Sequence, residues 1–159
     1  MYPITFIVRT KAFMTEIKIY NAVSKPNQLE KNEIVDFLFS NLEQYGDPKK
    51  DIQKAIDYSI KEFVSFGGFT MVILNDKKLM GAVVMNQTGM GGYIPENILV
   101  YIATHKNHRG EGLGKKLMNK AIQHAKGDVA LHVEAENPAK HLYEKLGFEN
   151  PYLEMRLKR

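Results

Sequence analysis

The sequence contains no cysteine, and this absence removes several kinds of chemistry at once. Disulfide bonds, a thiol nucleophile and cysteine-ligated zinc are excluded, and nothing in the residue usage argues for an oxidising compartment. The sequence also lacks any apolar stretch near the roughly 20 residues that span a bilayer. The short apolar run from Ile4 to Val8 has no basic segment before it and no cleavage site after it, so we expect no signal peptide. A cytoplasmic protein without a membrane partner is therefore predicted.

Neither repeats nor low-complexity segments interrupt the chain, and its 159 residues suit one domain rather than two. With 44% apolar and 25% charged residues, the composition is typical of a globular protein. The net charge of +4 suits a nucleic acid, a phosphorylated cofactor or an acidic substrate equally well. Because no aromatic interleaving or recognition-helix pattern accompanies the charge, we expect no nucleic-acid partner. The domain is predicted over 14–159, and residues 1–13 are interpreted as an N-terminal extension: an upstream start, an added leader or an extra edge strand.

The hydrophobic pattern changes its period along the chain. Alternation of polar and apolar residues predicts a first strand over 15–23 and a hairpin over 69–87, with a tight turn at Asn75 and Asp76. Apolar residues recurring at three and four predict amphipathic helices over 28–44, 52–63, 112–126 and 138–146. A nearly continuous apolar run predicts a central strand over 98–104 that is covered on both faces. Further strands are expected at 129–135 and 152–159.

The order of these elements predicts the fold class. Antiparallel strands come first, and one strand, helix and strand unit follows, whose helix demands a parallel pair. We therefore expect an α/β (α+β) fold with a mixed, mostly antiparallel central sheet and one βαβ unit. The glycine-rich segment after the central strand lies at that strand's carboxyl end, where ligands bind in open α/β sheets.

Three glycines occupy every second position of the segment 107–118, NHRGEGLGKKLM. No side chain at Gly110, Gly112 or Gly114 keeps an anion from the backbone, and the following helix offers free N–H groups and the positive end of its dipole. A nucleoside triphosphate loop needs Ser or Thr where Lys116 stands, and a dinucleotide fingerprint needs G-x-G-x-x-G. The spacing therefore disfavours ATP and NAD. A sharp connection between strand and helix, without any ligand, is the alternative interpretation.

The pattern R-x-x-G-x-G over 109–114, followed from Asn137 onward by NPAKHLYEKLGF, resembles the acetyl-coenzyme A (acetyl-CoA) site of the GNAT superfamily of N-acetyltransferases. The resemblance is good over about 98–148, and the order of elements before it also agrees. It implies the acyl-CoA N-acyltransferase (GNAT) fold, acetyl-CoA as co-substrate and no metal. It also implies direct transfer of an acetyl group to a primary amine of a small molecule or peptide. A module that binds CoA or a partner protein without catalysis is the alternative, and a homodimer is left open.

The resemblance further implies a set of cofactor contacts. In the family, backbone N–H groups of the glycine loop hold the pyrophosphate, and the end of the central strand pairs with the pantetheine arm like an added half-strand. Lys115 is at most a phosphate neighbour, because a basic run on a helix is commonly a solvated face. The residues implied in this way are Ile102, Ala103, Thr104, Arg109, Gly110, Glu111, Gly112, Leu113, Gly114 and Lys115.

Two residues near the end of the motif are candidates for the reaction. Tyr143 matches the family tyrosine, and a phenol with a pKa near 10 stays protonated at neutral pH and can donate to a developing thiolate. A core tyrosine with a satisfied hydroxyl is the alternative. Asn137 resembles an asparagine that contacts the cofactor arm, although it lies six residues before Tyr143 instead of the usual seven. It either makes that contact or caps the helix that begins at Pro138.

The start of the central strand supplies the candidate for a general base. Glu96 resembles the glutamate base of several histone-acetylating relatives, and a raised pKa would suit it to that role. A solvated loop glutamate is the alternative, Glu134 is a reserve candidate, and an ordered water could replace both. Acceptor contacts are expected from the two helices after the first strand and from the loop before the central strand, with Tyr93 and Glu96 the main candidates. No zinc-ligand spacing links the histidines at 105, 108, 132 and 141.

Overall fold

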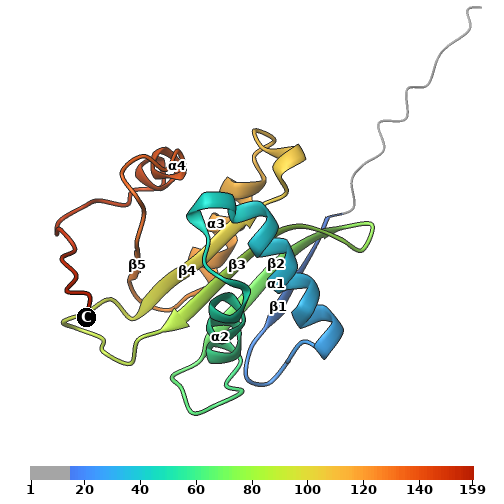
Figure 1. The fold of residues 1–159 in the computed structure, drawn as a ribbon, viewed down its shortest axis with the longest axis horizontal. Helices are drawn as coiled ribbons and strands as arrows, with labels where there is room; N and C mark the ends of the chain where they lie inside the picture. Colours follow the sequence, from blue (N-terminus) through green and yellow to red (C-terminus); the bar gives the residue numbers. More distant parts are fainter. Residues whose placement is uncertain (1–14) are drawn as a thin grey trace, which may run out of the picture.

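The computed structural model describes residues 15–159, so the predictions for 1–13 lie outside the described residues (Figure 1). The strands are β1 Thr15–Tyr20, β2 Gly68–Asn75, β3 Lys78–Gln87, β4 Asn97–Thr104 and β5 Val129–Leu131. The α-helices are α1 Gln28–Leu42, α2 Lys49–Ser59, α3 Leu113–His124 and α4 Ala139–Lys145. Two short 3₁₀ helices are also present: η1 Glu43–Tyr45 lies between α1 and α2, and η2 Lys106–His108 lies between β4 and α3. Within the described residues no helix is both long and apolar enough to cross a bilayer.

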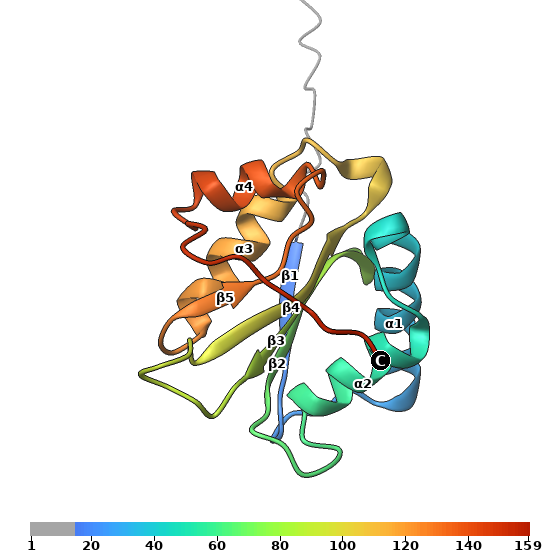
Figure 2. The same cartoon turned by 60° about the vertical axis from the view of Figure 1, so that its left-hand side comes forward.

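One five-stranded sheet organises the domain. Its strands lie in the order β1-β2-β3-β4-β5, with three antiparallel pairs followed by a parallel pair of β4 and β5. Helices α1 and α2 cover one face of the sheet, and α3 and α4 cover the other (Figures 1 and 2). The predicted mixed, mostly antiparallel sheet with one βαβ unit is therefore confirmed.

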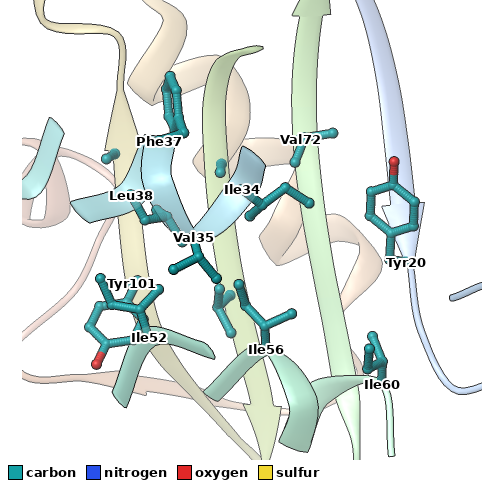
Figure 3. Packing of buried hydrophobic residues seen from close by; sticks show 13 residues of the cluster. Tyr20, Ile34, Val35, Phe37, Leu38, Ile52, Ile56, Ile60, Val72 and Tyr101 are labelled. Atoms are coloured by element: carbon teal, nitrogen blue, oxygen red, sulfur yellow. The ribbon is translucent and has the colours of Figure 1, made fainter. Parts of the chain in front are cut away.

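The sheet is covered on both faces because each helix presents one apolar stripe to it. On the α1 and α2 side, residues four apart on each helix turn toward the sheet and are almost fully buried (Figure 3). On the α3 side, Leu117 and Met118 pack against the opposite face of β2 and β3. Val72 joins the first cluster and its neighbours Met71 and Ile73 join the second, as the alternation of a strand requires. The first cluster includes Ile34, Leu38, Ile52, Ile56 and Ile60.

Strand β4 has a β-bulge and a stretch with one unpaired edge, and both features matter for the site. Its pairing with β3 moves from Leu99 opposite Met85 to Tyr101 opposite Val84, so Val100 is the extra residue of a bulge. Its pairing with β5 covers only Asn97–Leu99, opposite Val129–Leu131. Beyond Leu99, β4 continues along β3 while its other edge has no strand partner among the described residues.

Four sequence predictions about the strands need correction. The first strand ends at Tyr20 and not at residue 23. The hairpin turn lies at Asp76 and Lys77, both with positive φ, because Asn75 still pairs with Lys78. Strand β5 is shorter than the predicted 129–135, since the chain leaves the sheet to form α4. The alternating segment 152–159 is exposed and forms no strand, because the short β5 gives its apolar residues no long edge to pair with.

Candidate functional site

The glycine loop joins β4 to α3 and leaves backbone donors open. Gly110 and Gly112 have φ of +82° and +80°, and a methyl group built on either would meet no atom within 4 Å. Glycine at these two positions therefore permits the left-handed backbone conformation and is not required for close packing. Gly112 precedes α3 without any side-chain cap, and the first helical hydrogen bond runs from Lys116 N–H to Gly112 O. The first N–H groups of α3 therefore have no side-chain cap within 15–159 and can serve an anion.

The loop is fastened to the end of α1 by Asn41. This buried side chain accepts a hydrogen bond from Lys106 N–H (2.8 Å) and donates one to Phe37 O (2.8 Å). Arg109 Nη2 donates to Asn41 O (2.9 Å), and Arg109 Nη1 lies 3.6 Å from a Glu43 carboxylate oxygen. The Arg109 guanidinium therefore contacts α1 and η1, although half of the side chain remains exposed. Sequence reasoning missed Asn41, although a polar residue on the apolar face of α1 was a usable signal.

The predicted cofactor residues of β4 lie beyond the part of this strand that pairs with β5. Ile102, Ala103 and Thr104 still pair with β3 through one edge, while their other edge has no ladder partner among the described residues. Unpaired backbone N–H and C=O groups along such an edge can bind an extended chain that carries amides. The free edge is followed in the chain by η2 and the glycines at 110, 112 and 114, so the two predicted parts of the cofactor site are neighbours along the chain.

Helix α4 reaches the same place and carries Tyr143. A methyl group built on Gly114 would lie 3.5 Å from Leu142 Cδ2 and 3.8 Å from Thr104 Cγ2, so the end of β4, the start of α3 and α4 meet there. The Tyr143 ring is 7% exposed and packs edge-on against Phe148, with 5.9 Å between ring centroids. Its hydroxyl makes no hydrogen bond within 15–159, where no fully buried side-chain polar atom lacks a partner. The hydroxyl therefore retains contact with solvent, and burial of the ring raises the pKa of Tyr143 to about 12.

The structure shows Asn137 in the capping role that was one of its two predicted interpretations. Its Oδ1 accepts a hydrogen bond from Ala139 N–H (2.9 Å), and its carbonyl oxygen accepts from Lys140 N–H (3.1 Å). These contacts satisfy two N–H groups at the start of α4. Contact with a cofactor stays a prediction for Asn137, as do the phosphate contacts predicted for Glu111, Leu113 and the exposed Lys115.

Glu96 lies at the opposite end of β4 from the glycine loop. Its Oε2 accepts a hydrogen bond from Asp128 N–H (2.7 Å), and this bond is the main reason that the pKa of Glu96 is lowered. The expectation of a raised pKa is therefore wrong, because backbone donors stabilise the charged carboxylate. Tyr93 is 78% exposed in the neighbouring loop, and Glu134 is exposed after β5. No hydrogen bond or ion pair links either side chain to the glycine loop within 15–159, where no metal-binding group of three or more side chains occurs either.

A second contact missed by sequence reasoning lies on the α1 and α2 side of β4. The Tyr101 hydroxyl donates a 2.5 Å hydrogen bond to Oδ2 of Asp47, which lies between η1 and α2. Burial, and then Asp47 itself, raise the pKa of Tyr101 above that of an ordinary phenol. The two residues are 54 positions apart, so no local spacing could have indicated the pair.

Comparison with protein families identifies the family of the chain. The family model described as "Acetyltransferase (GNAT) domain" matches residues 67–150, which is more than half of the chain. The chain therefore belongs to the GNAT acetyltransferase family. The match includes the β2–β3 hairpin, β4, the glycine loop and Tyr143.

Solved structures with the same fold include several acetyltransferases. An aminoglycoside N-acetyltransferase AAC(6')-Iy in complex with CoA is 12% identical with a TM-score of 0.67, over 94% of this chain and 97% of that one. A ribosomal-protein-alanine N-acetyltransferase from Brucella melitensis biovar Abortus 2308 is 15% identical with a TM-score of 0.63, over 91% and 99%. A protein from Pyrococcus horikoshii OT3 is 24% identical with a TM-score of 0.64, over 88% and 93%. Curated protein sequences give no significant match.

Proposed function

We propose that this chain is an acetyl-CoA-dependent N-acetyltransferase that transfers the acetyl group directly to a primary amine of a small molecule or peptide. The observation that carries the proposal is the free edge of β4, which begins at Val100 and is connected to the uncapped start of α3 by the segment 105–112. This path suits a ligand with an amide-bearing arm and a pyrophosphate. The CoA-bound structure of a fold relative supports the same co-substrate.

The residues of the path fit the two chemical parts of acetyl-CoA. Backbone N–H groups after Gly110 and Gly112 can bind pyrophosphate oxygens, helped by the positive end of the α3 dipole. The edge of β4 over 102–104 can exchange hydrogen bonds with the amides of the arm. Acetyl-CoA bound in this way supplies a thioester carbonyl for attack by the acceptor amine and a thiolate as leaving group.

Tyr143 stands beside this path as a hydrogen-bond donor to the leaving sulfur. Its pKa of about 12 keeps the hydroxyl protonated throughout the neutral range. An ordinary thiol has a pKa of about 8.5, so complete transfer of the phenolic proton to a thiolate is unfavourable. A hydrogen bond that strengthens as charge develops on sulfur stabilises the transition state without such a transfer. Tyr143 is thus proposed as an electrostatic donor, and the final proton on sulfur comes from solvent.

The proton lost by the acceptor amine is assigned to water and not to a side chain. Glu96 is a weak base because its pKa is lowered, and the paired segment Asn97–Leu99 separates it from the free edge of β4. Solvent reaches the Tyr143 hydroxyl, so water can also reach the bond that breaks. This assignment makes Glu96 dispensable for turnover.

Ligand-dependent stability and thiol release test the proposed function together. Acetyl-CoA and CoA should stabilise the protein against heat by about 2.7 kcal/mol at 100 times the dissociation constant, whereas ATP and NAD should not. Thiol release from acetyl-CoA can then be followed with a panel of amines, without background because the chain has no cysteine. Absence of stabilisation by both coenzyme forms would overturn the proposal. Binding without thiol release for any amine would favour the non-catalytic module.

A further inference from the structure

Asp47 presents a carboxylate at a fixed place beside β4. The residue belongs to the connection between η1 and α2 and is exposed to solvent. Its Oδ2 is nevertheless held by the 2.5 Å hydrogen bond from Tyr101, whose ring is only 8% exposed in the core. Figure 3 shows this ring beside Ile52, with its hydroxyl at the rim of the apolar cluster. A loop carboxylate is thus positioned by a buried strand residue.

The position along β4 relates Asp47 to the proposed reaction centre. Tyr101 directly follows the bulged Val100, and β5 stops pairing at Leu99. The carboxylate therefore lies at the level of β4 where the proposed path for acetyl-CoA begins. It lies on the α1 and α2 side of the sheet, whereas Tyr143 belongs to the opposite α3 and α4 side. An acceptor that approaches from the Asp47 side meets the path opposite the proposed sulfur donor.

The Asp47 carboxylate keeps a charge that the fold does not neutralise at close range. Within 15–159 no Lys, Arg or His nitrogen lies within 4 Å of it, and its Oδ1 accepts no hydrogen bond. Two other aspartates of the same helical layer behave differently: Asp36 lies 2.7 Å from Lys49, and Asp57 lies 2.8 Å from Lys31. A carboxylate fixed through one oxygen by a neutral donor has the other oxygen free for a cation.

We infer that Asp47 is a positioning residue for the acceptor, and that the acceptor is a small amine carrying a second, positively charged ammonium group. The inference rests on the proposed function. The attacking amine must be uncharged, so the ammonium bound by Asp47 Oδ1 is the second group of the molecule and not the nucleophile. Diamines belong to this substrate class, whereas monoamines lack the group that Asp47 recognises.

One competing role for Asp47 involves the end of the chain. Arg156 pairs first with Glu154, and this pairing together with the weaker field of Asp47 raises the pKa of Arg156. If Asp47 served only to hold the C-terminal segment through Arg156, removal of either partner would have the same effect. The substitution Arg156→Gln therefore separates a role in the fold from a role in recognition.

The test compares 1,4-diaminobutane with n-butylamine, two acceptors of similar length that differ in the second ammonium. For the wild-type protein we expect kcat/KM for the diamine to exceed that for the monoamine by about tenfold, the value of one charge-assisted hydrogen bond. Asp47→Asn should remove this preference by raising KM for the diamine about tenfold, with kcat within about twofold. Tyr101→Phe, which keeps the charge and loses its orientation, should raise the same KM by about threefold.

Two controls and the binding of acetyl-CoA make each outcome decisive. Asp36→Asn removes a carboxylate already paired with Lys49, and Arg156→Gln removes the distant cation; neither should change the KM for the diamine. A wild-type enzyme that uses both amines equally, or an Asp47→Asn variant with unchanged KM, overturns this inference and leaves the proposed function intact. An Arg156→Gln variant that reproduces Asp47→Asn also overturns it. Absence of acetyl-CoA binding by calorimetry, or of thiol release with any amine, overturns both.

Discussion

The two sides of β4 contribute to the candidate site in different ways. On the α3 and α4 side, the site consists of the backbone of one contiguous loop, with glycines at 110 and 112, and of one side chain, Tyr143 on α4. On the α1 and α2 side, it consists of side chains such as Asp47, Tyr101 and Asn41, which tertiary contacts bring together. The proposed recognition of acetyl-CoA therefore depends chiefly on local backbone conformation. The side chains on the proposed acceptor side depend on the packing of distant segments. The effects of substitutions on the two sides should therefore differ.

Removal of the Tyr143 hydroxyl should have the largest effect on turnover. Tyr143→Phe deletes the proposed donor to the sulfur, and loss of one such transition-state hydrogen bond lowers kcat by about 100-fold. The KM for acetyl-CoA and the thermal stability should stay unchanged, because the hydroxyl has no protein partner within 15–159. Steady-state kinetics and a thermal melt measure these quantities.

Tyr20→Phe is a matched control for that substitution. Tyr20 is also buried, and burial followed by the effect of Glu30 raises its pKa to about 12, but it belongs to the apolar cluster on the α1 and α2 side. Its loss should leave kcat unchanged. Equal kcat in Tyr143→Phe and the wild type would show that Tyr143 is only a core residue.

A side chain in the glycine loop should chiefly weaken acetyl-CoA binding. Gly112→Ala places a methyl group in the open space before α3 and forces alanine to adopt a φ of +80°, at a cost of about 1 to 2 kcal/mol in stability. We expect at least about a tenfold loss of acetyl-CoA affinity, since backbone approach by the pyrophosphate is obstructed. Calorimetric titration and urea unfolding measure the two effects separately.

Gly92→Ala is a control that separates backbone strain from obstruction of the pyrophosphate. Gly92 has a φ of +96°, and a methyl group there also meets no atom within 4 Å, but it lies in the loop at the amino end of β4. This variant should lose similar stability and no acetyl-CoA affinity. If both variants bind acetyl-CoA as the wild type does, the glycine loop is only a sharp connection and does not hold the pyrophosphate.

The comparison of the two sides also explains what the sequence could predict. The helices and most strands follow from local periodicity, since residues such as Ile52 and Ile56 repeat on one face wherever the helix packs. The exposed segment 152–159 shows the limit of this reasoning, because alternation describes a strand's side chains and not the partner edge it needs. The short β5 is a tertiary outcome: its length depends on where the chain turns into α4.

The same limit applies to the site. The spacing of Gly110, Gly112 and Gly114 indicated an anion loop because its conformation is local. The lowered pKa of Glu96 could not be predicted, because its main cause is the N–H of Asp128, which directly precedes β5 and is 32 positions away in the sequence. The contact between Asp47 and Tyr101 was equally hidden by its separation in sequence.

Loss of Asn41 should have a moderate effect, because this residue links the two sides. Asn41→Ala removes the hydrogen bonds to Lys106 N–H and Phe37 O, which costs about 1 to 2 kcal/mol in stability. The loop loses its fastening to α1, so acetyl-CoA affinity should fall by about threefold as well. Asn32→Ala, at an exposed position on the same helix, should change neither quantity measurably. Loss of stability without loss of affinity would show that the loop holds its shape alone.

The smallest effect on turnover is expected at Glu96, where the structure and the resemblance to glutamate bases disagree. Glu96→Gln should keep kcat within about twofold, because no proton is assigned to this carboxylate. Its folded pKa lies below the ordinary 4.5, so ionisation contributes stability that is present above that value and is lost as pH falls through the folded pKa. Urea unfolding should therefore show the variant as slightly less stable than the wild type at neutral pH, with the difference vanishing on acidification. A fall in kcat beyond tenfold with unchanged stability would instead restore Glu96 as the base and place part of the reaction at the amino end of β4.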